Sequence, residues 1–123
     1  MPALNFQERF AEAVKNGAKR QTIRRKRKRP IKLGDTLYFK VNQRSKVKAC
    51  RSLGIAICKA AHRIEISDGR FWFIGSDYGL GKYTKQRDLD GIAQDDGFRD
   101  YAEMRDWFRD RYGLPFEGVL IEW

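Results

Sequence analysis

The sequence contains few of the residues that build metal sites and disulfide frameworks. Its 123 residues include one histidine, His62, and two cysteines, Cys50 and Cys58. Histidine and cysteine alone therefore cannot supply an ordinary four-ligand zinc site. Two cysteines are also too few for a disulfide scaffold, and we expect reduced thiols, as is typical of a cytoplasmic protein. We expect neither a metal ion nor another cofactor.

Long apolar runs are also missing. No stretch reaches the roughly 18 apolar residues that a transmembrane helix needs, and residues 1–10 lack the apolar segment of a signal peptide. Hydrophobic residues make up 41% of the chain and aromatic residues 13%, which is enough for a buried core. A chain of this length usually forms one domain. We therefore expect a single cytoplasmic domain, residues 1–123, without a membrane partner.

The chain has a formal net charge of +10, and its positive charge is concentrated in the first part. Residues 1–49 hold 15 Lys and Arg against three Asp and Glu, whereas residues 50–123 hold 11 against 13. Such asymmetry favours a polyanionic partner. Since the chain lacks the long amphipathic helix or lipidation signal of a membrane-surface protein, the favoured partner is a nucleic acid.

Helix signals occur near both ends of the chain. Asn5 and Glu8 have the spacing of a capping box, and apolar residues recurring every four positions predict a helix over 6–16 that ends at Gly17. Asp100 and Glu103 have the same spacing and precede a second predicted helix, Tyr101–Tyr112. Residues 18–32 are basic and predict a loop or an irregular strand.

Between these helices, apolar and alternating runs predict short strands at 37–41, 52–60, 62–66 and 70–74, and a last strand follows at 116–123. Short strands separated by turns favour a small barrel or a strongly curved sheet. Residues 75–87, rich in glycine, predict a long and functional loop. We therefore expect an α+β fold, a β-barrel of about five to six strands with two flanking helices.

Three segments together resemble the ASCH family, a branch of the PUA-like β-barrel superfamily. They are Gly17-Ala18-Lys19-Arg20-Gln21-Thr22-Ile23-Arg24 after the first helix, Lys32-Leu33-Gly34-Asp35 before a strand, and Asp96-Gly97-Phe98 before the last helix and closing strand. The resemblance implies a PUA-like barrel with a cleft beside the first helix. Members of this superfamily bind RNA or modified nucleosides.

One bacterial branch of the family is an amidohydrolase that removes the acetyl group from N4-acetylcytidine. The resemblance implies that its active-site lysine, threonine and carboxylate correspond to Lys19, Thr22 and Asp96, although that branch has Glu where this chain has Asp96. A lysine in a partly desolvated cleft can act as a base or nucleophile, and a carboxylate can orient it or transfer a proton. The structural alternative is a solvated Lys19, with Thr22 and Asp96 in turns.

A run of six cations follows the lysine and threonine. Such a run binds nucleic acid by neutralising phosphates, in a salt-dependent manner, whereas the alternative for a charge run is a solvated surface. The predicted nucleic-acid-binding residues are Arg20, Arg24, Arg25, Lys26, Arg27, Lys28, Arg29 and Lys40. Tyr78 and Tyr83, in the glycine-rich segment, are predicted to stack on bases.

Three functions fit these features. The first is binding of RNA or a modified nucleotide in a cleft beside the first helix. The second is metal-independent hydrolysis by Lys19, Thr22 and Asp96, as an N4-acetylcytidine-type amidohydrolase or a ribonuclease. The third is docking of the basic segment on an acidic protein. The sequence leaves the oligomeric state open.

Overall fold

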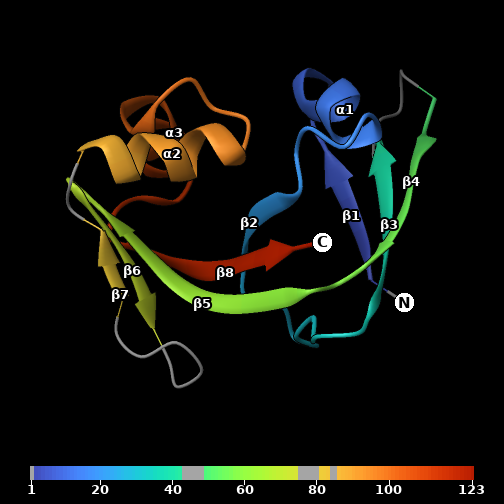
Figure 1. Cartoon of the computed structure of the whole chain (residues 1–123), viewed down its shortest axis with the longest axis horizontal. Helices are drawn as coiled ribbons and strands as arrows, with labels where there is room; N and C mark the ends of the chain where they lie inside the picture. The colour runs from blue at the N-terminus through green and yellow to red at the C-terminus, as the bar shows by residue number, and fades with distance from the viewer. Residues whose placement is uncertain (1, 43–48, 75–80, 84–85) are drawn as a thin grey trace.

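The computed structural model describes residues 2–42, 49–74, 81–83 and 86–123, which form an α+β fold (Figure 1). Its helices are α1 (Glu8–Lys15), α2 (Gln86–Asp95) and α3 (Tyr101–Tyr112). Its strands are β1 (Ala3–Phe6), β2 (Gln21–Arg25), β3 (Thr36–Val41), β4 (Arg51–Ile57), β5 (Ala60–Ser67), β6 (Arg70–Ile74), β7 (Gly81–Tyr83) and β8 (Phe116–Glu122).

The strands form two sheets. One sheet has the order β1-β3-β4, with β1 parallel to β3, and the other has the order β2-β8-β5-β6-β7, with antiparallel neighbours. Figure 1 shows β4 and β5 as one long curved band, so a single stretch of chain passes from the first sheet into the second. Instead of the single barrel or curved sheet that the sequence predicts, the described strands thus form two sheets joined by this band.

The predicted closed barrel of five to six strands is not found among the described residues, whose strand pairings leave both sheets open. Where the end of β8 meets β1 and β3, aromatic side chains join the two sheets, and no strand pairing does so among the described residues. The Trp123 ring, directly after β8, lies 4.6 Å from the Phe39 ring of β3 and 6.0 Å from the Phe6 ring of β1. Such ring contacts hold two sheets together without pairing their edges.

The described part of the chain contains three helices, so the expectation of two is wrong. The missed helix is α2, which begins inside the segment predicted as a long loop, and β7 also lies there. The core side of α2 presents only a few apolar residues, among them the buried Leu89 and Ala93, so its periodic signal is weak. No helix in the described part of the chain is long and apolar enough to cross a membrane.

The predicted N-terminal capping box is wrong. Residues Ala3–Phe6 pair with Tyr38–Val41 as strand β1, so helix α1 begins only after Gln7, which makes no side-chain capping bond. The Glu8 carboxylate instead accepts from the Arg51 guanidinium at 2.7 Å. Pairing with a distant strand has overridden the local signal, as tertiary contacts commonly do.

The predicted helix start at Asp100 is confirmed, although the return bond of the capping box goes to a different residue, because the Glu103 carboxylate accepts from the Arg99 N–H at 3.1 Å. The Asp100 carboxylate accepts from the Glu103 N–H at 2.9 Å, and Gly113, with φ 82°, ends helix α3. The helix packs on β8 through Phe108, whose ring lies 4.7 Å from the Phe116 ring.

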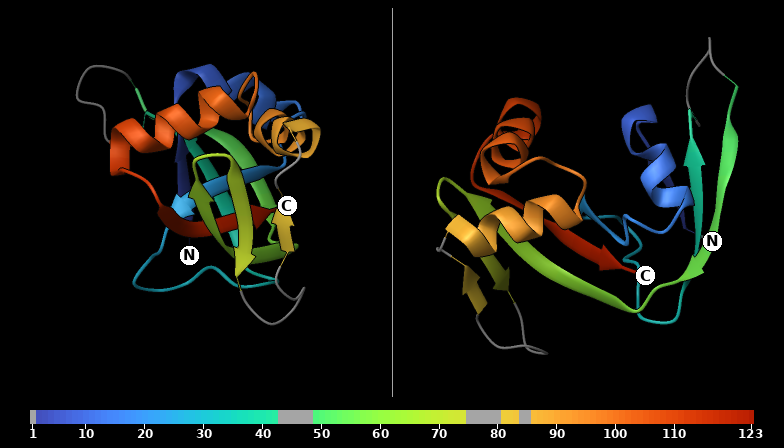
Figure 2. Two further views of the ribbon diagram at one scale, coloured as in Figure 1. Left: turned by 90° about the vertical axis from the view of Figure 1, so that its left-hand side faces the viewer. Right: turned by 45° about the horizontal axis from the view of Figure 1, so that its top comes forward.

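Two substructures result, as the right-hand view of Figure 2 shows. Helix α1 and the three-stranded sheet form one side, and α2 and α3 lie over the five-stranded sheet on the other. Strand β2 links them, because it follows α1 in the chain and pairs with β8. The basic segment 18–32 therefore contains a regular edge strand at the junction of the two substructures.

Candidate functional site

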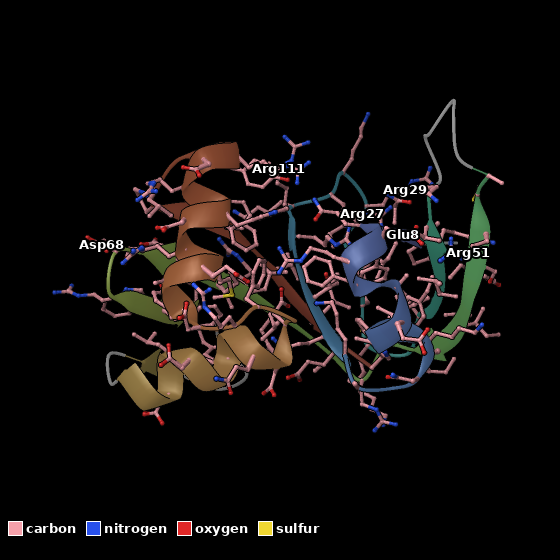
Figure 3. The ribbon with its side chains drawn as sticks, turned by 90° about the horizontal axis from the view of Figure 1, so that it is seen from above. Glu8, Arg27, Arg29, Arg51, Asp68 and Arg111 are labelled. Carbon is pink, nitrogen blue, oxygen red and sulfur yellow. The ribbon has the colours of Figure 1, made fainter. Side chains whose placement is uncertain are left out.

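A cleft of about 510 Å³ lies at this junction, and we call it the central cleft. Residues of β1, β2, α1 and α3 line it, together with the turn after α2. Its charged lining consists of six cations and one carboxylate: Lys19, Arg24, Arg25, Lys26, Arg27, Arg111 and Asp96. Six aromatic side chains also line it: Phe6, Phe10, Phe98, Trp107, Phe108 and Tyr112. In Figure 3 the molecule is viewed from above, with α1 and α3 on opposite sides.

Lys19 and Asp96 form a buried pair in this cleft. Only 3% of Lys19 and 4% of Asp96 is exposed. The Lys19 Nζ donates to the main-chain oxygen of Asp96 and lies 3.5 Å from its carboxylate oxygen Oδ1. The lysine predicted from the sequence thus lies beside the predicted aspartate, 77 positions later in the chain.

The turns after α1 and α2 bring this pair together. Gly17, with φ 84°, reverses the chain after α1, and the Lys19 N–H donates to the Ala13 carbonyl at 2.9 Å. Gly97, with φ 96°, follows the aspartate, and a Cβ atom there would lie 2.7 Å from the Phe10 ring. The glycine therefore permits both a left-handed backbone and a close approach to α1.

Gln21 is a further member of the site that the sequence analysis missed. Its Nε2 donates to the Asp96 Oδ1 at 3.4 Å and to the Ile92 carbonyl at 3.3 Å. The buried carboxylate is therefore held from two residues of the segment around β2. No local signal marked Gln21, because strand β2 begins at this residue and its partners lie about 70 positions later.

Burial shifts the pKa values of Lys19 and Asp96 in the directions that favour the uncharged form of each side chain. Desolvation lowers the pKa of Lys19 below its usual value, against the opposing attraction of Asp96. It raises the pKa of Asp96 to about 6, although Lys19 and Gln21 favour the charged form. Both groups consequently exchange protons more readily near neutral pH than their exposed counterparts would.

Thr22 and Arg24 lie next to the pair on β2. The Thr22 hydroxyl, on a side chain that is almost fully buried, accepts from the Arg24 Nε at 3.0 Å. The Arg24 guanidinium lies 4.8 Å from the centre of the Phe6 ring, and burial lowers the pKa of Arg24 to about 10. Thr22 still has its own hydroxyl hydrogen to donate, so the two side chains can present donors together.

Part of the predicted basic run reaches the central cleft. Arg25, Lys26 and Arg27 are exposed and line it. The Arg25 guanidinium lies 5.3 Å from the Tyr112 ring, and the Lys26 Nζ binds the Glu117 carboxylate at 2.7 Å. Figure 3 shows Arg27 and Arg29 at the same end of the molecule as Arg111 of α3.

The other predicted nucleic-acid-binding residues lie elsewhere. The residues outside the lining of the central cleft are Arg20, Lys28 and Arg29, which are exposed, and Lys40, which is half-buried on β3. Tyr78 lies outside the described residues. Tyr83 belongs to β7, and its side chain also lies outside the described part. The prediction of base stacking by these two tyrosines therefore stays a prediction.

Helix α3 supplies four residues of the cleft lining that the sequence analysis did not assign to it: Trp107, Phe108, Arg111 and Tyr112. The Arg111 guanidinium lies 4.6 Å from the Trp107 ring, and Tyr112 is 43% exposed although its position in the helix predicts core packing. The sequence signal that could have identified them is the spacing of Trp107 and Arg111, because residues four positions apart share one face of a helix. These side chains form a wall of aromatic rings with a cation over it.

In the described part of the chain, no group of three or more His, Cys, Asp or Glu side chains could hold a metal ion. Comparison with known proteins found no matching family model, no matching curated protein and no matching solved structure.

Proposed function

We propose that the central cleft binds a nucleotide unit of RNA or a modified nucleotide, with Arg25, Lys26 and Arg27 holding the phosphate backbone. The observation that carries this proposal is the lining of the cleft, in which six cations accompany a single carboxylate and an aromatic wall. Phosphates need cationic donors, and unpaired bases stack on aromatic rings or arginine planes. The volume of about 510 Å³ is typical of small-ligand sites.

The resemblance to the ASCH family enters this proposal as support. Its three segments belong to the turn after α1 and strand β2, the loop before β3, and the turn before α3. Under the proposal, the two curved sheets are the two parts of a PUA-like barrel, and the cleft between α1 and α3 is the family's ligand cleft. The meeting of Lys19, Thr22 and Asp96 in one cleft is what this interpretation requires.

Binding of a labelled single-stranded RNA tests the proposal. Changing Arg25, Arg27 and Arg111 together to Gln should weaken binding roughly 100-fold, because removing each arginine–phosphate hydrogen bond costs about 1 kcal/mol. The matched control changes Arg70, Arg99 and Arg109 to Gln, because these exposed arginines lie outside the lining of the cleft. Equal affinities of the two triple variants would rule the proposal out.

Hydrolysis is the second candidate, and the buried Lys19–Asp96 pair beside Thr22 favours it. A neutral Lys19 could take a proton from the attacking water or attack a carbonyl itself. The Thr22 hydroxyl could polarise that carbonyl by donating to it, and a protonated Asp96 could deliver a proton to the leaving amine. This scheme fits an N4-acetylated cytidine. On RNA itself, Lys19 would instead take the proton of a 2′-hydroxyl as that oxygen attacks the adjacent phosphorus, and Asp96 would protonate the departing 5′-oxygen. No step in either scheme uses a metal ion.

Turnover by the variant Lys19→Met distinguishes catalysis from binding. If the protein is a hydrolase, this variant should lose at least about 100-fold in kcat while its affinity for the substrate changes little. Lys15→Met, which alters an exposed lysine of α1, is the control and should retain activity. If neither substrate is turned over by the wild type, in the presence or absence of a chelator, the hydrolase hypothesis fails.

A further inference from the structure

A second cleft, of about 440 Å³, borders the same basic segment. Apolar side chains of β5, β8 and the segment before β3 line it: Ile31, Ala61, Val119 and Ile121. Strand pairing sets Ala61 opposite Ile121 and Arg63 opposite Val119 on neighbouring strands. Ile31 and Ile121 are buried, so the half-buried Ala61 and Val119 form the accessible part of this apolar surface. Such a surface can accept the face of a base or the carbon atoms of a sugar.

Cations surround this apolar lining. Arg25, Lys26 and Arg27 line the second cleft as well as the central cleft, and Arg63 of β5 lines the second cleft alone. The Glu117 carboxylate, which is not part of the lining, binds both Lys26 and Arg63, at 2.7 and 2.8 Å. Because one carboxylate faces four cations, this cleft keeps an excess of positive charge.

We propose that one strand of nucleic acid occupies both clefts, passing from the central cleft across Arg25, Lys26 and Arg27 into the second. This inference rests on the proposed function and extends it, because the ligand becomes a strand that spans two clefts rather than one nucleotide unit in one cleft. The three shared cations connect the clefts, and a nucleic-acid strand carries a phosphate at every nucleotide to meet them. Apolar surface beyond these cations receives the next bases, as in other grooves for single strands.

Affinity as a function of ligand length tests this inference. The ligands are a 5′-mononucleotide and single-stranded oligonucleotides of about two to ten nucleotides, and the wild-type affinity should rise at least about tenfold with length once both clefts are reached. Arg63→Gln should remove most of this gain and leave the affinity for the mononucleotide unchanged.

Arg109→Gln is the matched control for this variant. The two arginines are alike in exposure, 52% for the Arg109 side chain and 56% for that of Arg63, and each forms an ion pair with a carboxylate. Arg109, however, lines neither cleft. Since both positions are exposed, neither substitution should unfold the protein, and Arg109→Gln should keep the whole length dependence.

Amide chemical shifts supply a second measurement that needs no variant. The mononucleotide should shift signals from the central cleft, and the longest oligonucleotide should also shift those of Ala61 and Val119. An affinity independent of length, with these two signals unmoved, would overturn the inference and leave the proposed function standing. Absence of binding by the mononucleotide and by every oligonucleotide would instead reject the proposed function, and the inference with it.

Polyglutamate of matched charge separates a nucleic acid from an acidic polypeptide. It should bind weakly and should not shift the signals of Ala61 and Val119, because it has no planar base to place on the apolar lining. Equal affinity for polyglutamate, abolished in the same way in Arg63→Gln, would make an acidic protein the occupant and overturn the inference.

Discussion

Lys19 shows how burial changes the chemistry of one residue. In solvent its ammonium group would be one more cation of a basic segment, but here it is enclosed with Asp96 and Gln21. Desolvation disfavours the charge on both members of the pair, while their mutual attraction favours it. This balance suits a group that holds or exchanges a proton, and it would serve recognition of a nucleotide as well as hydrolysis.

The pH dependence of stability measures this balance at Asp96. Burial raises its pKa to about 6 from an ordinary 3.8, so between these values the folded state binds more protons than the unfolded state. The resulting stabilisation is complete below about pH 4 and is lost as the pH rises through 6. The wild type should therefore lose on the order of 1–3 kcal/mol of unfolding free energy over this range relative to Asp96→Asn.

Urea denaturation at a series of pH values between 4 and 7 provides the measurement. Asp95→Asn is the control, because this neighbouring carboxylate is exposed, and its curve should run parallel to that of the wild type. Parallel curves for the wild type and Asp96→Asn would show that Asp96 has no raised pKa.

At the scale of elements, the turn from α2 to α3 positions the carboxylate against α1. Gly97 combines φ 96° with a Cβ position 2.7 Å from the Phe10 ring, whereas Gly17 combines φ 84° with open space. Gly17→Ala should therefore cost only the backbone strain, about 1 kcal/mol, and Gly97→Ala should cost about 2–4 kcal/mol because the ring must also move.

Thermal or urea unfolding of the two glycine variants checks this prediction. Gly97→Ala should in addition weaken nucleotide binding, since the shifted turn carries Asp96, and Gly17→Ala serves as its comparison for strain alone. Equal losses of stability in the two variants would mean that the turn does not press against α1.

Elements with strong local signals were predictable from the sequence. The capping signal at Asp100 and the alternation over 37–41 each act between neighbours in the chain, and both elements are present. Elements that depend on distant pairing were not. Strand β1 pairs with β3 over thirty positions later in the chain, so the capping signal at Asn5 was misleading. Helix α2 has a short apolar face, and this pattern alone was too weak to predict the helix.

The same difference applies to the site. The resemblance pointed to Lys19, Thr22 and Asp96, three residues that the fold brings into one cleft. Gln21, Trp107 and Arg111 were missed because in the sequence they look like ordinary strand or helix residues. Their place in the site becomes visible only when the fold brings the two substructures together. Side-chain partnerships across 70 or more positions, such as that of Gln21 with Asp96, leave no pattern in a single sequence.

At the scale of the whole molecule, two sheets joined through aromatic contacts leave a junction where cations collect. The first 49 residues carry most of the positive charge, and strand β2 with its basic continuation places part of it on both clefts. Two carboxylates of α3, Asp106 and Asp110, form ion pairs with arginines of the same helix, whereas Glu103 pairs with Arg9 of α1. The proposed nucleic-acid ligand depends on this cationic surface over the junction.

The salt dependence of RNA binding tests this central claim most directly. The logarithm of the wild-type affinity for a single-stranded oligonucleotide should fall steeply and linearly with the logarithm of the salt concentration. The slope should become shallower by about 2 when Arg25, Arg27 and Arg111 are all changed to Gln, because each neutralised phosphate of a single strand contributes about 0.7 to it. The account predicts that result, with the slope of the Arg70, Arg99 and Arg109 control unchanged; an affinity insensitive to salt, or one slope shared by all three proteins, would contradict it.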